Sequence, residues 1–171
     1  MKNLSLIGLM LTLTLSSISH AGTYVGASAG VGVTGDTYKH SYDSSLAYGV
    51  QAGETFLKVL GLGLYYQRNQ KHEASTSNLS IHNIGVDGTF HLPLAGLYAG
   101  AKVGLGHLSA TSDADGSASK WAIAYGPQVG WDFSLVVVSV GFNLNYLMYS
   151  ETGPFSEFGS FSGLGVVKLW L

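Results

Sequence analysis

The side chains best suited to charge-pair chemistry lie in two stretches on either side of the connection Pro93-Leu94-Ala95-Gly96. If these stretches pair as antiparallel strands about that connection, Asp87 lies directly opposite Lys102. Both residues belong to the more polar face of their stretch, so we expect both inside the fold. Opposite charges at paired positions attract, and a buried charge needs a partner. The sequence therefore predicts an internal Asp87–Lys102 pair.

The same register brings histidines and serines together on the opposite face. His82 lies across from His107, and Ser80 lies across from Ser109. Because a histidine can act as the base for a serine nucleophile, His107, Ser109 and His82 are candidate residues of a hydrolase. No acidic side chain is placed to orient either histidine, and two histidines alone do not define a metal site. We therefore predict no metal and no cofactor, and we favour a protein without enzymatic activity.

Eight stretches of alternating apolar and small or polar residues must position these side chains. A period of two is that of a strand with two unlike faces. Most of the stretches have ten residues or more, whereas strands of soluble proteins have about 5–6 and membrane-spanning strands need about 9–11. They span residues 23–35, 46–57, 59–68, 79–92, 97–108, 121–133, 135–149 and 161–171. We predict an all-β fold, an eight-stranded antiparallel up-and-down transmembrane β-barrel.

The connections alternate between short and long. Short connections lie near Lys58, at 93–96 and near Ser134. Long connections hold most of the charge and span 36–45, 69–78, 109–120 and 150–160. Short turns on one rim and long polar loops on the other are typical of outer-membrane barrels. Because the first connection is long, we expect both termini on the short-turn, periplasmic side, with four extracellular loops.

The bulky apolar face is expected to point outward, toward lipid. Only 11% of the residues are charged, about half the share of a soluble domain, and eight strands enclose a narrow interior. Trp121 and Trp131 share the outer face and lie ten residues apart. Ten residues rise about 33 Å along a strand, which at a tilt of roughly 40° spans about 25 Å along the membrane normal and matches the height of the apolar band. The predicted aromatic girdle consists of Trp121, Trp131, Tyr125, Phe133 and Tyr146.

The other face is expected to fill the lumen with a polar network. Its predicted members are Asp87, Lys102, Lys168, Gln128, Asn143, Asn145, Gln51 and Glu54. Glu54 has the parity of the outer face, but a bulge at Gly53 would turn it inward. Pro127 lacks an N–H group in mid-strand, which predicts a bulge or a missing ladder bond. A side-chain plug is favoured over a narrow, porin-like pore because eight strands leave little free space.

Residues 1–21 have the order of a secretory signal peptide. Lys2 precedes an apolar run from Leu4 to Leu15, and small residues at Ser19 and Ala21 mark a cleavage site. We therefore expect the barrel to comprise residues 22–171. The chain has no cysteine, which excludes disulfides and thiolate metal sites. Its net charge of −2 gives no reason to expect a nucleic-acid partner.

Together, the signal, the eight long strands and the alternating connections resemble the small outer-membrane barrels of the OmpA transmembrane-domain and OmpX type. The resemblance implies a Gram-negative outer-membrane location, a structural or surface-interaction role, a monomer, and contact with outer-membrane lipid and lipopolysaccharide. It also implies recognition of the C-terminal strand by the assembly machinery, although the chain ends in Leu171, preceded by Trp170, rather than in an aromatic residue. His107-Leu108-Ser109 resembles the His-x-Ser of lipid A deacylase barrels, but Ala110 replaces the Asn that follows there. A lipid A-modifying hydrolase and a narrow pore therefore remain alternatives.

Overall fold

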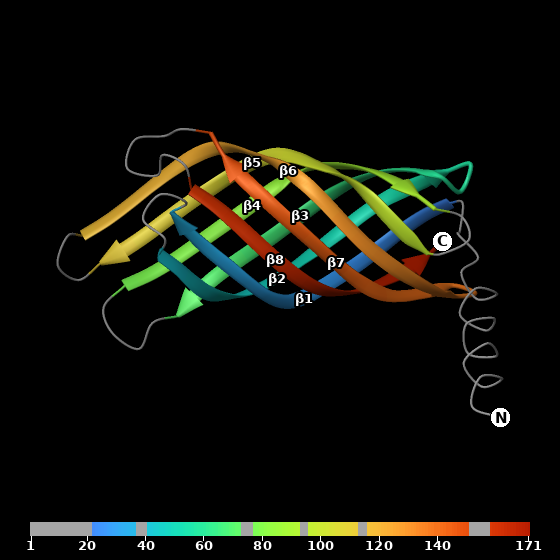
Figure 1. Cartoon of the computed structure of the whole chain (residues 1–171), viewed down its shortest axis with the longest axis horizontal. Coiled ribbons are helices and arrows are strands. Elements are labelled where there is room, and N and C mark those ends of the chain that lie inside the picture. The colour runs from blue at the N-terminus through green and yellow to red at the C-terminus, as the bar shows by residue number, and fades with distance from the viewer. Residues whose placement is uncertain (1–21, 37–40, 73–76, 93–95, 113–115, 151–157) are drawn as a thin grey trace, which may run out of the picture.

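The computed structural model is a closed barrel of eight strands (Figure 1). It describes residues 22–36, 41–72, 77–92, 96–112, 116–150 and 158–171, so the predicted signal peptide lies outside the described residues. The strands are β1 (Gly22–Asp36), β2 (Ser41–Phe56), β3 (Leu60–His72), β4 (Ser77–His91), β5 (Leu97–Ser112), β6 (Gly116–Leu135), β7 (Val138–Tyr149) and β8 (Phe158–Trp170). Each strand pairs antiparallel with its neighbour in sequence, and β8 closes on β1. The predicted fold class is confirmed.

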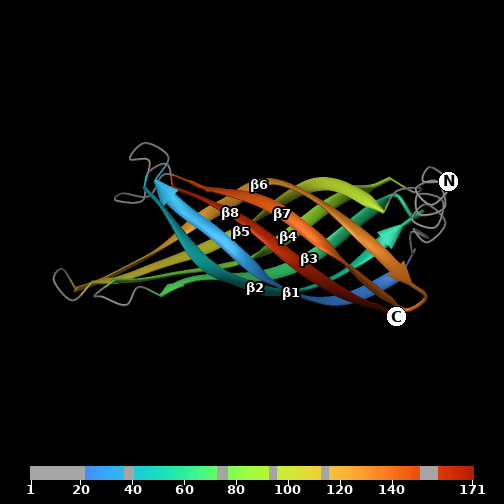
Figure 2. The same ribbon diagram turned by 60° about the horizontal axis from the view of Figure 1, so that its bottom comes forward.

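The pairing register sets the tilt of the strands. Passing from Val25 through the partner position on each successive strand returns to β1 at Gly35, ten residues farther along. A shift of ten residues around eight strands tilts them by about 40° from the barrel axis. The tilt is visible in both views of the ribbon, in which β5 and β6 extend farthest at the end opposite the C-terminus (Figures 1 and 2).

Side chains alternate between the lumen and the outer surface along every strand. On β6, Ala122, Ala124, Gln128 and Asp132 are buried, whereas Trp121, Ile123 and Val129 are exposed. Small and polar residues thus fill the lumen, and bulky apolar residues cover the outside. Asp87 pairs with Lys102, and His82 pairs with His107, as the 93–96 connection predicts. No helix among the described residues is long and apolar enough to cross a membrane.

The predicted long connections are too long. The strands continue into them: β3 reaches His72, and β4 starts at Ser77. Likewise, β5 reaches Ser112 and β6 starts at Gly116. The sequence indicated loops there because the apolar alternation stops. Backbone pairing does not need that alternation, so the ladder continues beyond the apolar band with polar side chains.

Neither predicted bulge is present. The register between β6 and β7 is the same on both sides of Pro127, since Tyr125 pairs with Met148 and Gln128 with Asn145. Only the pairing of Gly126 and Pro127 with β7 is interrupted, which is the missing ladder contact expected from proline.

Glu54 is exposed on the outer face, and its assignment to the lumen was wrong. The β1–β2 register runs without interruption through Gly53 and Glu54, so no extra residue exists to invert the parity. The glycine at 53 has another cause: a Cβ atom there would lie 2.6 Å from the Leu62 carbonyl oxygen and 2.8 Å from the Tyr24 hydroxyl.

Candidate functional site

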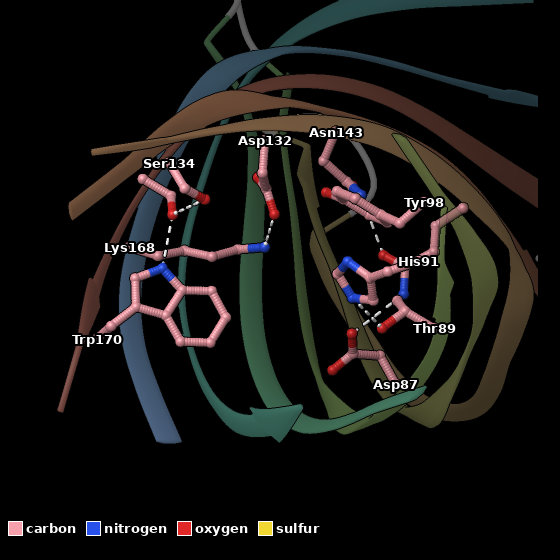
Figure 3. A network of polar contacts seen from close by, with 11 residues as sticks. Asp87, Thr89, His91, Tyr98, Asp132, Ser134, Asn143, Lys168 and Trp170 are labelled. Atoms are coloured by element: carbon pink, nitrogen blue, oxygen red, sulfur yellow. Dashed lines mark hydrogen bonds and ion pairs between the residues drawn. The ribbon is translucent and has the colours of Figure 1, made fainter. Parts of the chain in front are cut away.

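The short-turn half of the lumen holds a buried ion pair (Figure 3). Lys168 Nζ on β8 lies 2.5 Å from Asp132 Oδ2 on β6, and both side chains are at least nine-tenths buried. The ammonium also lies 5.2 Å from the Tyr24 ring centre and 4.9 Å from that of Tyr98. The faces of these rings attract a cation. Four strands of the wall, β1, β5, β6 and β8, are therefore linked through one charge.

A chain of three side-chain amides, which we call the amide relay, links a second buried carboxylate, that of Asp87, to the opposite wall. Gln128 Nε2 donates to Asp87 Oδ2 over 3.1 Å, and Asn143 Nδ2 donates to Gln128 Oε1 over 3.0 Å and to the Tyr98 hydroxyl over 3.1 Å. Asn145 Nδ2 then donates to Asn143 Oδ1 over 2.9 Å. The relay connects β4, β5, β6 and β7 at mid-lumen through a chain of hydrogen bonds from three amides to one another, to a phenol and to a carboxylate.

Lys102 is buried opposite Asp87, but its ammonium lies over the Tyr65 ring, 4.4 Å from the centroid. The predicted cross-strand pairing is therefore present as register, with the charge directed to an aromatic face. Asp87 Oδ1 has no hydrogen-bond partner among the described residues. Gln51, also predicted for the network, has the inward parity of β2, is partly buried, and lies beside Gly26 and Lys168.

The half of the lumen nearer the long connections contains a cluster of buried apolar side chains. Ile81, Leu108 and Leu147 have no exposed surface, and Ala122, Ala124 and Tyr149 pack with them. Beside this cluster, Gln67 and Asn69 of β3 donate to Ser160 and Ser162 of β8. We call the six apolar residues the apolar plug. The plug and the polar groups beside it are buried inside the barrel.

Sequence reasoning found the polar layer and missed the apolar plug. The inward parity of β4, β5 and β7 places Ile81, Leu108 and Leu147 inside, so the signal was present. The expectation of a polar lumen drew attention away from them. Asp132 was also left out of the predicted network, although it has the same parity as Gln128.

The outer face carries a second polar cluster. His82 Nδ1 is hydrogen-bonded to the Tyr66 hydroxyl at 2.7 Å, and His82 Nε2 to Ser80 Oγ at 3.1 Å. Arg68 Nε donates to Ser80 Oγ over 3.3 Å. His107 packs against Trp121, with ring centres 4.8 Å apart and ring planes tilted by 43°. Among the described residues of this cluster, the hydrogen bond between a histidine and a serine is therefore the one between His82 and Ser80. The predicted pair was His107 and Ser109.

The predicted girdle residues lie on the outer face of β6 and β7. Trp121 is 60% exposed and Tyr125 is 46% exposed. Trp131 lies ten residues toward the short turns, 6.1 Å from the Phe133 ring centre and 6.3 Å from that of Phe142. Tyr146 and Phe133 are partly exposed. Their role as a membrane girdle stays a prediction.

No protein-family model and no curated protein sequence matches this chain. The fold is similar to that of Neisserial surface protein A, with a TM-score of 0.73 and 15% identity over 88% of this chain and 98% of that one. It is also similar to Ail, the attachment invasion locus protein of Yersinia pestis, with a TM-score of 0.65 and 11% identity over 89% and 100%. The outer membrane protein OprG of Pseudomonas aeruginosa matches with a TM-score of 0.53 and 12% identity over 91% and 99%.

Proposed function

The chain has the fold of the small eight-stranded outer-membrane barrels, and we propose that it is a surface protein of the outer membrane with a sealed lumen. In this proposal the barrel is a rigid support, and the long-connection end and the outer face meet the protein's partners. The similar proteins are bacterial outer-membrane proteins, which supports the location. The bulky apolar outer face supports it independently, because such a surface is stable only against lipid.

The observation that carries the proposal is the burial of apolar and polar side chains inside the barrel. Ile81, Leu108 and Leu147 face inward and are completely buried. Nearer the short turns, the amide relay and the Lys168–Asp132 pair link side chains of different strands inside the barrel. Eight strands leave space for side chains and little else. A porin-like role is therefore disfavoured, and we expect partners to bind the exterior of the barrel.

Planar-bilayer recording tests this proposal. We expect no stable conductance from the purified protein and none from Lys102→Ala, because the apolar plug still closes the lumen. Ile81→Ala/Leu108→Ala/Leu147→Ala is the matched positive variant, since it opens the plug and leaves the charged residues in place. Heat-modifiable migration on gels checks that each variant is folded. A reproducible conductance of the unmodified protein that changes in Lys102→Ala would overturn the sealed-lumen proposal.

A further inference from the structure

The outer surface of the barrel contains an apolar groove. Its volume is about 820 Å³, and it crosses the outer faces of β8, β1, β2, β3 and β4. Small side chains at Ala27 and Ala52 lie between larger neighbours, since Ala52 pairs with Val25 and Leu64. The groove is thus a hollow within the surface that should face lipid tails. Its volume is in the range of about 300–1,000 Å³ typical of small-molecule sites.

One end of the groove reaches the outer polar cluster. Tyr66 and Ile84 line the groove, and the Tyr66 hydroxyl is hydrogen-bonded to His82. Arg68 and His82 follow two positions farther toward the long connections on β3 and β4, where they pair with each other. The guanidinium of Arg68 uses Nε for Ser80, which leaves its two terminal nitrogens open among the described residues. The apolar groove and the outer polar cluster with its cationic Arg68 are therefore continuous on the surface of the barrel.

We propose that the groove and the cluster Tyr66–Arg68–Ser80–His82 bind one phosphate-bearing, acylated lipid of the outer leaflet. Acyl chains lie in the groove, and the phosphate lies against Arg68 and His82. An arginine fork matches the geometry of phosphate oxygens, and its charge strengthens the hydrogen bonds. The polar cluster lies at the long-connection edge of the apolar outer face, the level at which headgroups of the outer leaflet are expected.

The same geometry favours binding over hydrolysis. The 3.1 Å contact between Ser80 and His82 resembles a nucleophile–base pair. However, residues 80–82 lie within uninterrupted ladders to β3 and β5. A strand interior paired on both sides offers no free backbone N–H group to stabilise an oxyanion. Ser80 instead accepts from Arg68 and fixes the direction of the guanidinium.

Native mass spectrometry of the purified, folded barrel in detergent tests the lipid site. The probes are phosphatidic acid, diacylglycerol with the same two chains, and inorganic phosphate. We expect one phosphatidic acid to bind, diacylglycerol to bind at least about 10-fold more weakly, and inorganic phosphate not to displace the lipid. Arg68→Gln should weaken phosphatidic acid binding about 10-fold or more, whereas the exposed cation variant Lys120→Gln should leave it unchanged.

A second variant tests the groove separately from the charge. Ala52→Phe fills the hollow with an aromatic ring and should weaken both lipids, without removing any polar group. Equal binding to Arg68→Gln and Lys120→Gln, or unchanged binding to Ala52→Phe, would overturn the site. The inference rests on the proposed outer-membrane role, but this assay does not, because it uses purified protein. Fractionation of cells tests the location independently, so the two failures are distinguishable.

Discussion

Removing the carboxylate of Asp132 should destabilise the barrel strongly. Lys168 is 4% exposed, and Asp132 Oδ2 is its anionic partner at 2.5 Å. Breaking a buried ion pair from one side costs about 3–5 kcal/mol, because an uncompensated charge stays buried. In Asp132→Asn, the rings of Tyr24 and Tyr98 remain close to the ammonium and offset about 1 kcal/mol of that cost. We therefore expect a loss of about 3 kcal/mol in the free energy of unfolding.

The assay is equilibrium unfolding in denaturant, with the protein folded in phospholipid vesicles and the folded fraction measured by gel migration. Asp132→Asn/Lys168→Met removes both charges and should recover most of the loss, because no unpaired charge then remains. Glu54→Gln is the control, since it removes an exposed carboxylate of the outer face and should change little. An Asp132→Asn protein within about 1 kcal/mol of the unmodified barrel would refute the reasoning.

Three further results are expected. Leu57 and Lys58 are the central residues of the turn in which Val59 N–H donates to the Phe56 carbonyl, and their φ values are 52° and 63°. Leu57→Asn/Lys58→Gly should therefore raise stability in the same unfolding assay by about 1 kcal/mol, and a loss would contradict this assignment. A Cβ atom at Gly100 would collide with the carbonyl oxygen of Gly88, whereas one at Gly88 meets nothing within 4 Å. Gly100→Ala should therefore lower the free energy of unfolding by about 1–3 kcal/mol, and Gly88→Ala should change it very little. Equal effects of the two substitutions would be inconsistent with the register. In variants with a single tryptophan, brominated lipid should strongly quench the fluorescence of the outward-facing Trp121. It should only weakly quench that of Trp170, whose indole is hydrogen-bonded to Ser139 inside the barrel. The reverse order would contradict the assignment of the inner and outer faces.

The sequence determined the strand count, the faces and the register because each depends on local parity. The four-residue connection 93–96 was enough to pair Asp87 with Lys102, and the structure has that register along all of β4 and β5. Strand ends on the long-connection side were not predictable. Beyond the apolar band, the pattern of polar residues such as those at 69–72 is compatible with both a strand and a loop. Only the backbone pairing seen in the structure distinguishes the two.

The candidate site was less accessible to sequence reasoning. Parity places a side chain inside, but does not determine which partner it reaches across the lumen. Lys168 meets Asp132 from a strand that is not its neighbour in the sheet, and Lys102 turns to Tyr65 instead of to Asp87. The groove was similarly hidden, because it arises where small side chains on adjacent strands come together through register.

Cysteine accessibility in intact cells tests the sealed, outward-oriented barrel most directly, because the chain has no cysteine of its own. The three variants are Ser117→Cys near a long connection, Val137→Cys in a short turn, and Asn145→Cys in the lumen. Residues 117 and 137 are exposed, whereas Asn145 is only 1% exposed. A membrane-impermeant maleimide should label residue 117 in intact cells, residue 137 only after the outer membrane is permeabilised, and residue 145 in neither case. Labelling of residue 137 but not of residue 117 in intact cells, or labelling of residue 145 in the folded protein, would contradict the proposed orientation or the sealed lumen.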